Sequence, residues 1–508
     1  MHVDVPTLSD PTVAPVAPRG RASQPGANVR SAPEPSRRSH LGPLLFFALF
    51  GAFYVIPPQG ADRIFHVSGI IEAANALREG QFPVRVAPNL LEGVRYAPFQ
   101  FYGNFPYTAA AIFSFLPGLD AYDGWRLMVF LCVTCAGFYT YRISLSLTRQ
   151  TWPSVVAGAV FVAAPYLSTD FRARFAYTEA VSFCLLPPVL YYSLRAFVSP
   201  RKSSILLGGV FWALVSLSHN ITYLYASTLT ALFFFSLASF DVRKYAKRMI
   251  RLGLCWGLGL LLAAWYVVPQ LLVLHTIPIA NDNANATPMG TTVWAPIDVL
   301  LSPVLRIDPS ARNTPYIGLQ VGWPILAAVL LAAFHVVRAA ARRARGHASP
   351  VGLGRPGAAL MAALLVAAAL AFFIVWSPVD FWRYVPSIFY NLQITYRLLM
   401  FVVLWGSLLA GLALAASWRG RPGGMPASAA WACLLVVAIA GMSFQGWGLD
   451  RLSRRTVKAM ERNPTLGPAD ANYVPLAGKM PEHRIEPTAE APLLPAKEVA
   501  PLLRPAAR

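Results

Sequence analysis

The chain has 508 residues, of which 56% are hydrophobic and only 13% are charged. Soluble domains contain about 25% charged residues, so this composition excludes a conventional soluble protein. The formal net charge is +20, but the basic residues cluster in short segments between apolar stretches. This arrangement is typical of membrane topology, and we expect no nucleic-acid partner.

The first 40 residues are rich in Pro, Ser, Ala and Arg and predict a disordered cytoplasmic tail. The apolar stretches that follow are long enough to cross a hydrocarbon core of about 30 Å. In lipid every backbone amide needs a partner, so these stretches must be helices. Spans are expected at 44–56, 125–147, 153–168, 180–198, 204–219, 222–240, 250–274, 322–338, 358–376, 393–416 and 427–446.

One further apolar stretch, 105–119, is short and is flanked by Pro106 and Pro117. If it crossed the membrane, every basic cluster after it would lie outside, against the positive-inside rule. We therefore expect a surface or re-entrant segment there. The prediction is an all-α polytopic protein of the bacterial inner membrane, with about 11 transmembrane helices and a cytoplasmic N-terminus.

This topology divides the chain into a tail, a membrane domain and a second tail. The membrane domain is expected at 41–447, with periplasmic loops at 59–124, 275–321 and 377–392. The C-terminal tail, 448–508, is Pro-rich and is expected to lie in the periplasm with little regular structure. As an alternative for part of it, the run Asn472-Tyr473-Val474-Pro475 docks back on the body.

Asp62 and His66 open a predicted helix that ends near Gly80. Their i,i+4 spacing puts a carboxyl and an imidazole on one helix face, where they suit a base, a metal site or a phosphate contact. In the alternative interpretation, Asp62 only caps the helix and His66 is a solvated neighbour.

Arginines and aromatic residues recur in the predicted outer segments. Arg172 and Arg174 lie on a short outer turn where positive charge is disfavoured, which indicates a phosphate ligand or an ion pair with Glu179. Arg397 begins a span and either snorkels to the interface or holds a diphosphate. Aromatic residues of the first loop form either a sugar or lipid platform or an interfacial belt. The candidate substrate-binding residues are Arg63, Arg85, Tyr96, Tyr102, Arg172, Arg174, Tyr177, Glu179, His219, Asn220 and Arg397.

His219 and Asn220 are polar residues at the end of an apolar span. Polar groups at membrane depth are costly and indicate function by default. The alternative is a hydrogen bond between packed helices.

Taken in order, these motifs resemble a known family, the 6-pyruvoyl-tetrahydropterin synthase-related membrane proteins, over roughly residues 44 to 475. The label does not imply pterin chemistry. The matching motifs are Asp62…His66, Phe82-Pro83-Val84-Arg85, Phe99-Gln100-Phe101-Tyr102-Gly103, Tyr177…Glu179 with Leu186-Pro187, Ser218-His219-Asn220 and Gln393…Tyr396-Arg397.

That family is similar to the GT-C superfamily of polyprenyl-phosphate-dependent glycosyltransferases. The resemblance implies hexosyl or pentosyl transfer at the periplasmic face, from a polyprenyl-phosphate donor in the membrane to a saccharide or lipid acceptor of the envelope or exopolysaccharide. It implies an acidic residue in the first loop, which maps to Asp62. As an enzyme the chain would use Asp62 as the general base, and His66 would orient Asp62 or the acceptor. Many GT-C enzymes pair two acids with a divalent metal, Mg²⁺ or Mn²⁺, but here Arg63 follows Asp62 and the next acid is Glu72.

Two alternatives use the same residues without chemistry. One is a transporter or flippase of lipid-linked saccharides, for which paired broken helices in two related halves would be expected; none is evident in the sequence. The other is a non-catalytic protein of polysaccharide assembly.

Overall fold

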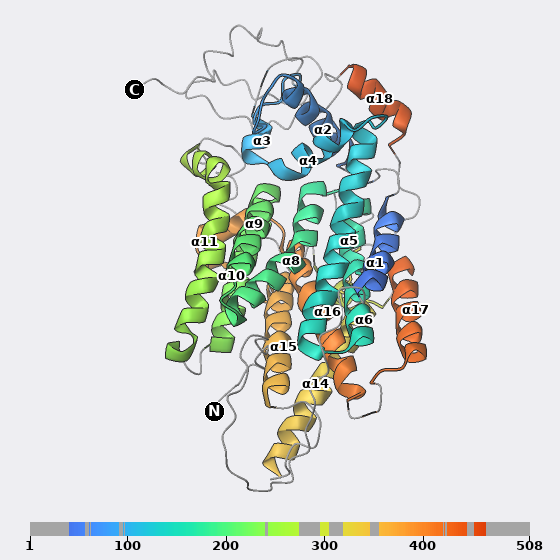
Figure 1. Cartoon of the computed structure of the whole chain (residues 1–508), viewed down its shortest axis with the longest axis vertical. Helices are drawn as coiled ribbons and strands as arrows, with labels where there is room; N and C mark the ends of the chain where they lie inside the picture. Colours follow the sequence, from blue (N-terminus) through green and yellow to red (C-terminus); the bar gives the residue numbers. More distant parts are fainter. Residues whose placement is uncertain are drawn as a thin grey trace, which may run out of the picture.

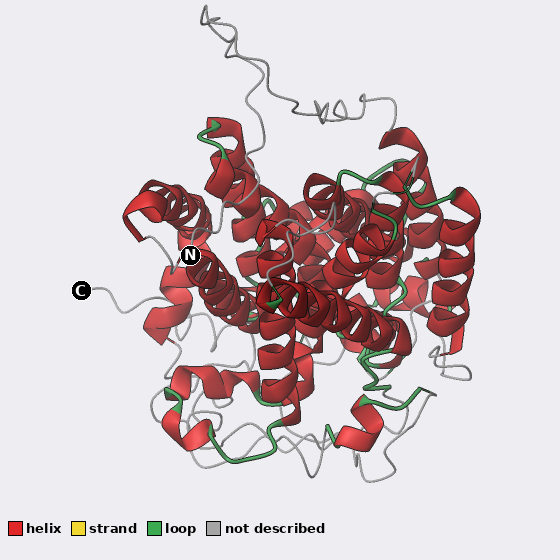
Figure 2. Ribbon diagram, turned by 90° about the horizontal axis from the view of Figure 1, so that it is seen from below, coloured by secondary structure: helices red, strands yellow, loops and turns green. Residues whose placement is uncertain are grey.

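The computed structural model describes residues 40–55, 60, 62–90, 95, 97–238, 242–273, 295–303, 318–345, 355–419, 421, 424–443 and 452–463. Within these residues the chain forms helices and connecting loops, with isolated bridge residues and no strand. Figure 2 shows the described helices packed side by side, viewed from one end. The expected all-α, polytopic class is confirmed.

The membrane helices follow the predicted spans closely. They are α1 (Leu41–Tyr54), α5 (Ala121–Thr148), α6 (Thr151–Val162), α8 (Tyr177–Val198), α9 (Lys202–Ser218), α10 (Asn220–Ala238), α11 (Val242–Val273), α14 (Trp323–Ala344), α15 (Arg355–Trp376), α16 (Leu399–Ser417) and α17 (Ala427–Ser443).

Among the described helices, seven are long and apolar enough to span a bilayer, and α6 with the bent segment after it makes a possible eighth. That segment contains α7 (Pro165–Ser168) and the π-helical turn η2 (Thr169–Ala173). The apolar helices α1, α9 and α17 are shorter. The predicted count of about 11 is reached only if all three of these cross as well, so that number is not confirmed.

A layer of short helices covers one end of the bundle (Figure 1). It contains α2 (Arg63–Arg78), α3 (Pro98–Phe101), α4 (Asn104–Ser114) and α18 (Arg454–Arg462). Helix α4 occupies the stretch that we expect not to cross. Its 11 residues extend about 16 Å, half of a hydrocarbon core, because a helix rises about 1.5 Å per residue. It packs on α2 and α5 instead.

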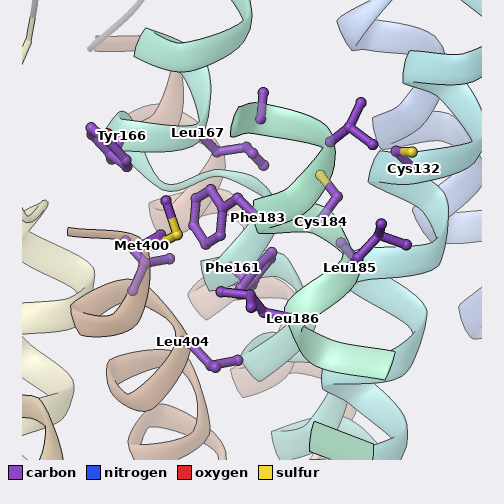
Figure 3. Packing of buried hydrophobic residues seen from close by; sticks show 14 of the residues in the cluster. Cys132, Phe161, Tyr166, Leu167, Phe183, Cys184, Leu185, Leu186, Met400 and Leu404 are labelled. Carbon is purple, nitrogen blue, oxygen red and sulfur yellow. The ribbon is translucent and has the colours of Figure 1, made fainter. Parts of the chain in front are cut away.

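The core of the bundle lies where α6, α8 and α16 meet. The most apolar part of α16 is 94% buried, against 17% for α14, so α16 is central and α14 peripheral. Figure 3 shows Phe183 and Leu186 of α8 directed towards Phe161 of α6 and towards Met400 and Leu404 of α16. Such large interdigitating side chains fix the depth and rotation of α8, which carries part of the site described below.

The remaining described helical turns lie in loops and are short. They are α13 (Ile297–Leu300), η4 (Trp382–Tyr384), η5 (Ser387–Leu392) and η6 (Thr395–Leu398), which leads directly into α16.

The C-terminal tail is more ordered than predicted, because α18 docks on the first turn of α5. The Arg454 Nε lies 3.2 Å from the Asp120 Oδ2, and the Glu461 Oε1 accepts a hydrogen bond from the Ala121 N–H at 2.9 Å. Val457 and Met460 are buried beneath the helix. The expectation of little regular structure in 448–508 is therefore wrong for 454–462. The run 472–475 lies outside the described residues.

Candidate functional site

Asp62 stands at the N-terminus of α2, and its backbone is tied to the turn that follows η2. The Asp62 N–H donates to the Arg174 carbonyl at 3.0 Å. Gly60 adopts φ +101°, and a Cβ there would lie 2.5 Å from the Arg172 carbonyl oxygen, so this close approach requires glycine. Asp62 is exposed, so its carboxylate lies at the surface of the helical layer.

His66 is buried one turn further along α2, with 1% of its surface exposed. Its Nδ1 shares a 2.6 Å hydrogen bond with the Tyr107 hydroxyl of α4, and its ring packs against Tyr102, Tyr107 and Phe175. Burial, with a smaller contribution from the Arg174 charge, lowers the pKa of His66 to about 3. The imidazole is therefore neutral at pH 7. Its hydrogen bond to Tyr107 joins α2 to α4, so His66 is not a solvated neighbour of Asp62.

The depressed pKa of His66 predicts a specific acid sensitivity. The imidazole titrates at about 3 in the folded state and near 6.5 when unfolded. Between these values the unfolded state binds the extra proton, so stability falls as the pH is lowered from about 6.5, by up to about 1.4 kcal/mol per pH unit. His66→Asn, which keeps a hydrogen-bonding group near Nδ1, should flatten this slope. Unfolding of both proteins in detergent between pH 4.5 and 7.5 measures the difference, and parallel curves would contradict it.

A buried network of two arginines and two carboxylates lies beneath this layer. The Arg174 NH1 is 2.9 Å from the Asp170 Oδ1 and 3.2 Å from the Glu179 Oε1. The Arg397 Nε lies 3.4 Å from the Glu179 Oε2, and the Tyr166 hydroxyl donates to the Glu179 Oε1 at 2.7 Å. Glu179 is thus paired with both arginines.

The local backbone explains how these groups meet. Asp170 and Arg174 lie on and directly after the π-helical turn η2, which widens the helix and lets both side chains point inward. Gln393 has φ 62°, the left-handed region that is uncommon for a residue other than glycine. Its Oε1 accepts from the Arg397 NH1 at 2.8 Å. Strained positions of this kind cluster at functional sites.

Arg397 is the member of the network that reaches the surface. Its side chain is 14% exposed, whereas that of Glu179 is 2% exposed. NH1 is held by the Leu392 carbonyl and by Gln393, and Nε faces Glu179. None of these contacts uses NH2, which leaves one edge of the guanidinium for an anion.

The Tyr102 ring packs against Phe65 and His66 of α2 and is influenced by the charges around it. Burial raises the pKa of Tyr102 to about 12, and the charges of Asp62, Arg397 and Glu179 all act on its phenol. The following residue, Gly103, packs so closely on the Ser218 carbonyl that any Cβ would clash. The charges of both Asp62 and Arg397 therefore reach this one tyrosine.

His219 and Asn220 lie between α9 and α10, and both have packing partners. The His219 Nδ1 shares a 2.8 Å hydrogen bond with the Thr222 hydroxyl. Burial lowers the pKa of His219 to about 4, against the opposing effect of Glu179. The Asn220 Nδ2 donates to the Phe101 carbonyl at 3.2 Å. Asn220 thus makes the helix-packing hydrogen bond that is the alternative to a ligand role.

Several of the predicted substrate-binding residues point elsewhere. Arg172 donates to the Phe53 carbonyl and lies over the Phe53 and Tyr54 rings of α1. The expected pairing of Arg172 with Arg174 at one phosphate is therefore wrong, because the π-helical turn directs the two side chains to different partners.

The other three donors in this group hold the helical layer together. Arg63 donates to the Gly60 carbonyl at 2.7 Å. Arg85 contacts the Trp265 carbonyl and ring of α11. The Tyr177 hydroxyl donates to the Pro106 carbonyl at 3.0 Å. Tyr96 lies outside the described residues.

A metal site would need more acids than the described residues bring to Asp62. Glu72, the next acid in the sequence, is fully buried and accepts hydrogen bonds from the Asn89 N–H and side chain and from Asn75. No group of three or more metal-binding side chains occurs in the part of the chain that the structure describes. The implied two-acid arrangement does not fit these residues, and the mechanism below includes no metal.

Asp170 and Tyr166 belong to the buried network but were not predicted from the sequence, and Tyr396 was named only as part of a motif. Tyr166 bonds to Glu179, and the Tyr396 ring lies 5.2 Å from the Arg174 guanidinium. Asp170 offered a usable signal, since it stands four residues before Arg174, the spacing of a helical ion pair.

The family model described as 6-pyruvoyl-tetrahydropterin synthase related domain, membrane protein, matches residues 99–447. The chain belongs to this family of membrane proteins, as the sequence motifs predicted. An uncharacterized protein of Lactococcus lactis subsp. cremoris (strain MG1363) is 25% identical over 170 residues, which are 32% of this chain and 27% of that protein.

Similar solved structures are glycosyltransferases of the GT-C superfamily. Arabinofuranosyltransferase AftD from Mycobacteria is 18% identical, over 86% of this chain and 27% of that one, with a TM-score of 0.48. The oligosaccharyltransferase of Archaeoglobus fulgidus in the apo form is 13% identical, over 88% and 62%, with a TM-score of 0.48. ArnT from Cupriavidus metallidurans bound to undecaprenyl phosphate is 14% identical, over 79% and 63%, with a TM-score of 0.44. The chain thus spans about a quarter of AftD and of the Lactococcus protein, and less than two thirds of the other two. At these scores the likeness carries no argument about the site.

Proposed function

We propose that the chain is a membrane glycosyltransferase that moves a sugar from a polyprenyl-phosphate donor to a saccharide or lipid acceptor at the periplasmic face of the bacterial inner membrane. The observation that carries this proposal is that the backbone of the exposed Asp62 bonds to Arg174, whose side chain shares Glu179 with the partly exposed Arg397. A base and a phosphate ligand in one site are the two groups that glycosyl transfer from a lipid phosphate requires.

In the proposed reaction, the acceptor oxygen forms a bond to the anomeric carbon while the bond from that carbon to the lipid phosphate oxygen breaks. Asp62 takes the hydroxyl proton as the general base. The polyprenyl phosphate leaves with an additional negative charge, which Arg397 stabilises. His66 is neutral and positions α2 through Tyr107, so its role is structural.

The charge of Arg397 is useful only because it is held in place. Glu179 lies beside the Nε of Arg397, and Gln393 accepts a hydrogen bond from its NH1. The buried Arg174 pairs with both Glu179 and Asp170. A preorganised guanidinium does not have to reorganise when charge develops on the phosphate. The network therefore serves as a scaffold for a single phosphate-binding edge.

The basic end of the bundle supports the proposed orientation. Arg338, Arg342 and Arg343 lie in the C-terminal part of α14, which projects away from the end that carries α2, α3 and α4 (Figure 1). Under the positive-inside rule this basic end is cytoplasmic, so Asp62 faces the periplasm.

The function is tested by transfer of a labelled sugar from a polyprenyl-phosphate donor, using the purified full chain in lipid nanodiscs. Hexosyl and pentosyl donors are each tested with envelope lipids and with oligosaccharides as acceptors. Transfer that depends on the protein supports the proposal. If the chain reconstituted in lipid vesicles moves the donor across the membrane and transfers no sugar, the chain is a flippase and the proposal is wrong.

Arg397→Gln is expected to raise the KM for the lipid donor and to lower kcat, together reducing kcat/KM by about 10²-fold, because a charge-assisted phosphate contact is lost. Arg85→Gln is a matched control, since Arg85 is an exposed arginine of the same end and contacts Trp265. Steady-state kinetics with varied donor concentration separate the two parameters. Equal effects in the two variants would remove Arg397 from the site.

A further inference from the structure

Two arginines meet at the end of α5 and α8 that lies away from the candidate site. The Arg142 NH2 of α5 donates to the Tyr191 hydroxyl at 2.8 Å, and the Arg195 NH1 of α8 donates to the same oxygen at 3.0 Å. The two nitrogens therefore lie at most about 6 Å apart, a distance at which like charges repel in a protein interior.

Neither arginine forms an ion pair with a carboxylate in the part of the chain that the structure describes. The ion pairs there involve Arg95, Arg126, Arg174, Arg397 and Arg454. Arg142 and Arg195 are both only partly exposed. Partly buried positive charges that converge on a neutral phenol are favourable only when an anion completes the site.

The surroundings are aromatic. Arg142 lies over the Phe138 and Tyr191 rings, and Arg195 lies over Tyr191. The Tyr139 and Tyr192 hydroxyls share a 2.9 Å hydrogen bond beside them. Tyrosines and arginines at this density are typical of a membrane interface, where a ring faces the acyl chains and a polar tip faces the headgroups.

The position along the helices agrees with such an interface. Arg195 follows Glu179 by 16 residues on α8, and a helix rises about 1.5 Å per residue, so the two lie about 24 Å apart along the axis. Arg142 lies 19 residues after Asp123 on α5, or about 28 Å by the same measure. These separations match one hydrocarbon thickness of about 30 Å.

We propose that Arg142, Arg195 and Tyr191 form a binding site for the phosphate headgroup of an anionic phospholipid in the leaflet opposite the candidate site. The two guanidinium groups bind the phosphate oxygens, the Tyr191 hydroxyl turns its proton towards the anion, and the neighbouring rings contact the glycerol and upper acyl chains. The site does not depend on glycosyl transfer, so it can be tested whether or not the chain is an enzyme.

The test is native mass spectrometry of the full chain in detergent, titrated with dioleoylphosphatidylglycerol, with dioleoylphosphatidylcholine or with inorganic phosphate. The test variant is a double variant that carries Arg142→Gln and Arg195→Gln. The matched control is a double variant that carries Arg201→Gln and Lys202→Gln. The control removes two positive charges from exposed residues at the same end. The wild type is expected to bind phosphatidylglycerol at least tenfold more tightly than phosphatidylcholine.

The Arg142/Arg195 variant should lose this preference, with at least a tenfold rise in the Kd for phosphatidylglycerol, and the control should change less than twofold. Equal changes in both variants, or none in either, would overturn the site. Inorganic phosphate binding as tightly as the lipid would overturn the assignment to a lipid. Tyr191→Phe keeps both positive charges and removes one hydroxyl contact, so it should keep the preference for phosphatidylglycerol and raise its Kd less than the Arg142/Arg195 variant does. If the double variant does not purify, the single variants should each raise the Kd at least threefold.

Discussion

Asp62→Asn should reduce sugar transfer by about 10²- to 10⁴-fold, the usual contribution of a positioned general base. Asparagine has the same shape but does not take up the acceptor proton. The backbone N–H that bonds to the Arg174 carbonyl is retained, so the variant should fold normally. The loss should appear in kcat, because Asp62 contributes little to binding of the lipid phosphate. Single-turnover transfer with saturating donor measures it.

Glu79→Gln provides the matched control for Asp62. Glu79 follows the last residue of α2, pairs with Arg95 at 2.8 Å and is largely solvated. Its loss changes the charge of the same loop by the same amount. If Asp62→Asn keeps wild-type transfer, or if Glu79→Gln loses as much, Asp62 is not the base.

Glu179→Gln is expected to have the largest effect on stability. The change leaves the partly buried Arg397 without a carboxylate and leaves Arg174 with Asp170 alone. Removing one member of a buried ion pair typically costs about 3 to 5 kcal/mol, because the remaining charge stays desolvated. We expect a clear decrease in the melting temperature in detergent, together with loss of transfer, since Arg397 loses the group that holds its Nε.

The double variant Glu179→Gln with Arg397→Gln tests whether the network acts through charge balance. It removes the unpaired cation and leaves the pair of Arg174 and Asp170 intact. Its destabilisation should be smaller than the sum of the two single changes by about 0.5 to 3 kcal/mol. Additive effects would show that Glu179 and Arg397 are not coupled in the folded protein.

The sequence predicted the membrane architecture well because hydrophobic length and charge position act locally. A run of about 20 apolar residues has to cross the bilayer as a helix whatever surrounds it. The short stretch 105–119, with prolines at both sides, was recognisable as non-crossing, and α4 confirms that it is too short. The docking of α18 was missed because it depends on Asp120 and Asp123, which lie more than 300 residues earlier in the chain.

The candidate residues were also visible in the sequence, as charged and polar groups at the ends of apolar spans, but their partners were not. Arg172 and Arg174 look equivalent in the sequence, and a π-helical turn sends one to α1 and the other into the buried network. His66 was predicted to act beside Asp62 or, in the alternative, to be a solvated neighbour, and the packing of α2 on α4 buries it.

The sequence by itself therefore determined the fold class, the positions of the apolar helices and the family, because each of these follows from local composition and short motifs. Only the tertiary structure decided that Arg397 meets Glu179 across 218 positions of the chain and that Arg142 and Arg195 share one hydroxyl. The physical reason is that a charge buried in a membrane protein takes its role from whichever helix lies beside it. That neighbour is set by packing over the whole bundle, which no local pattern of residues records.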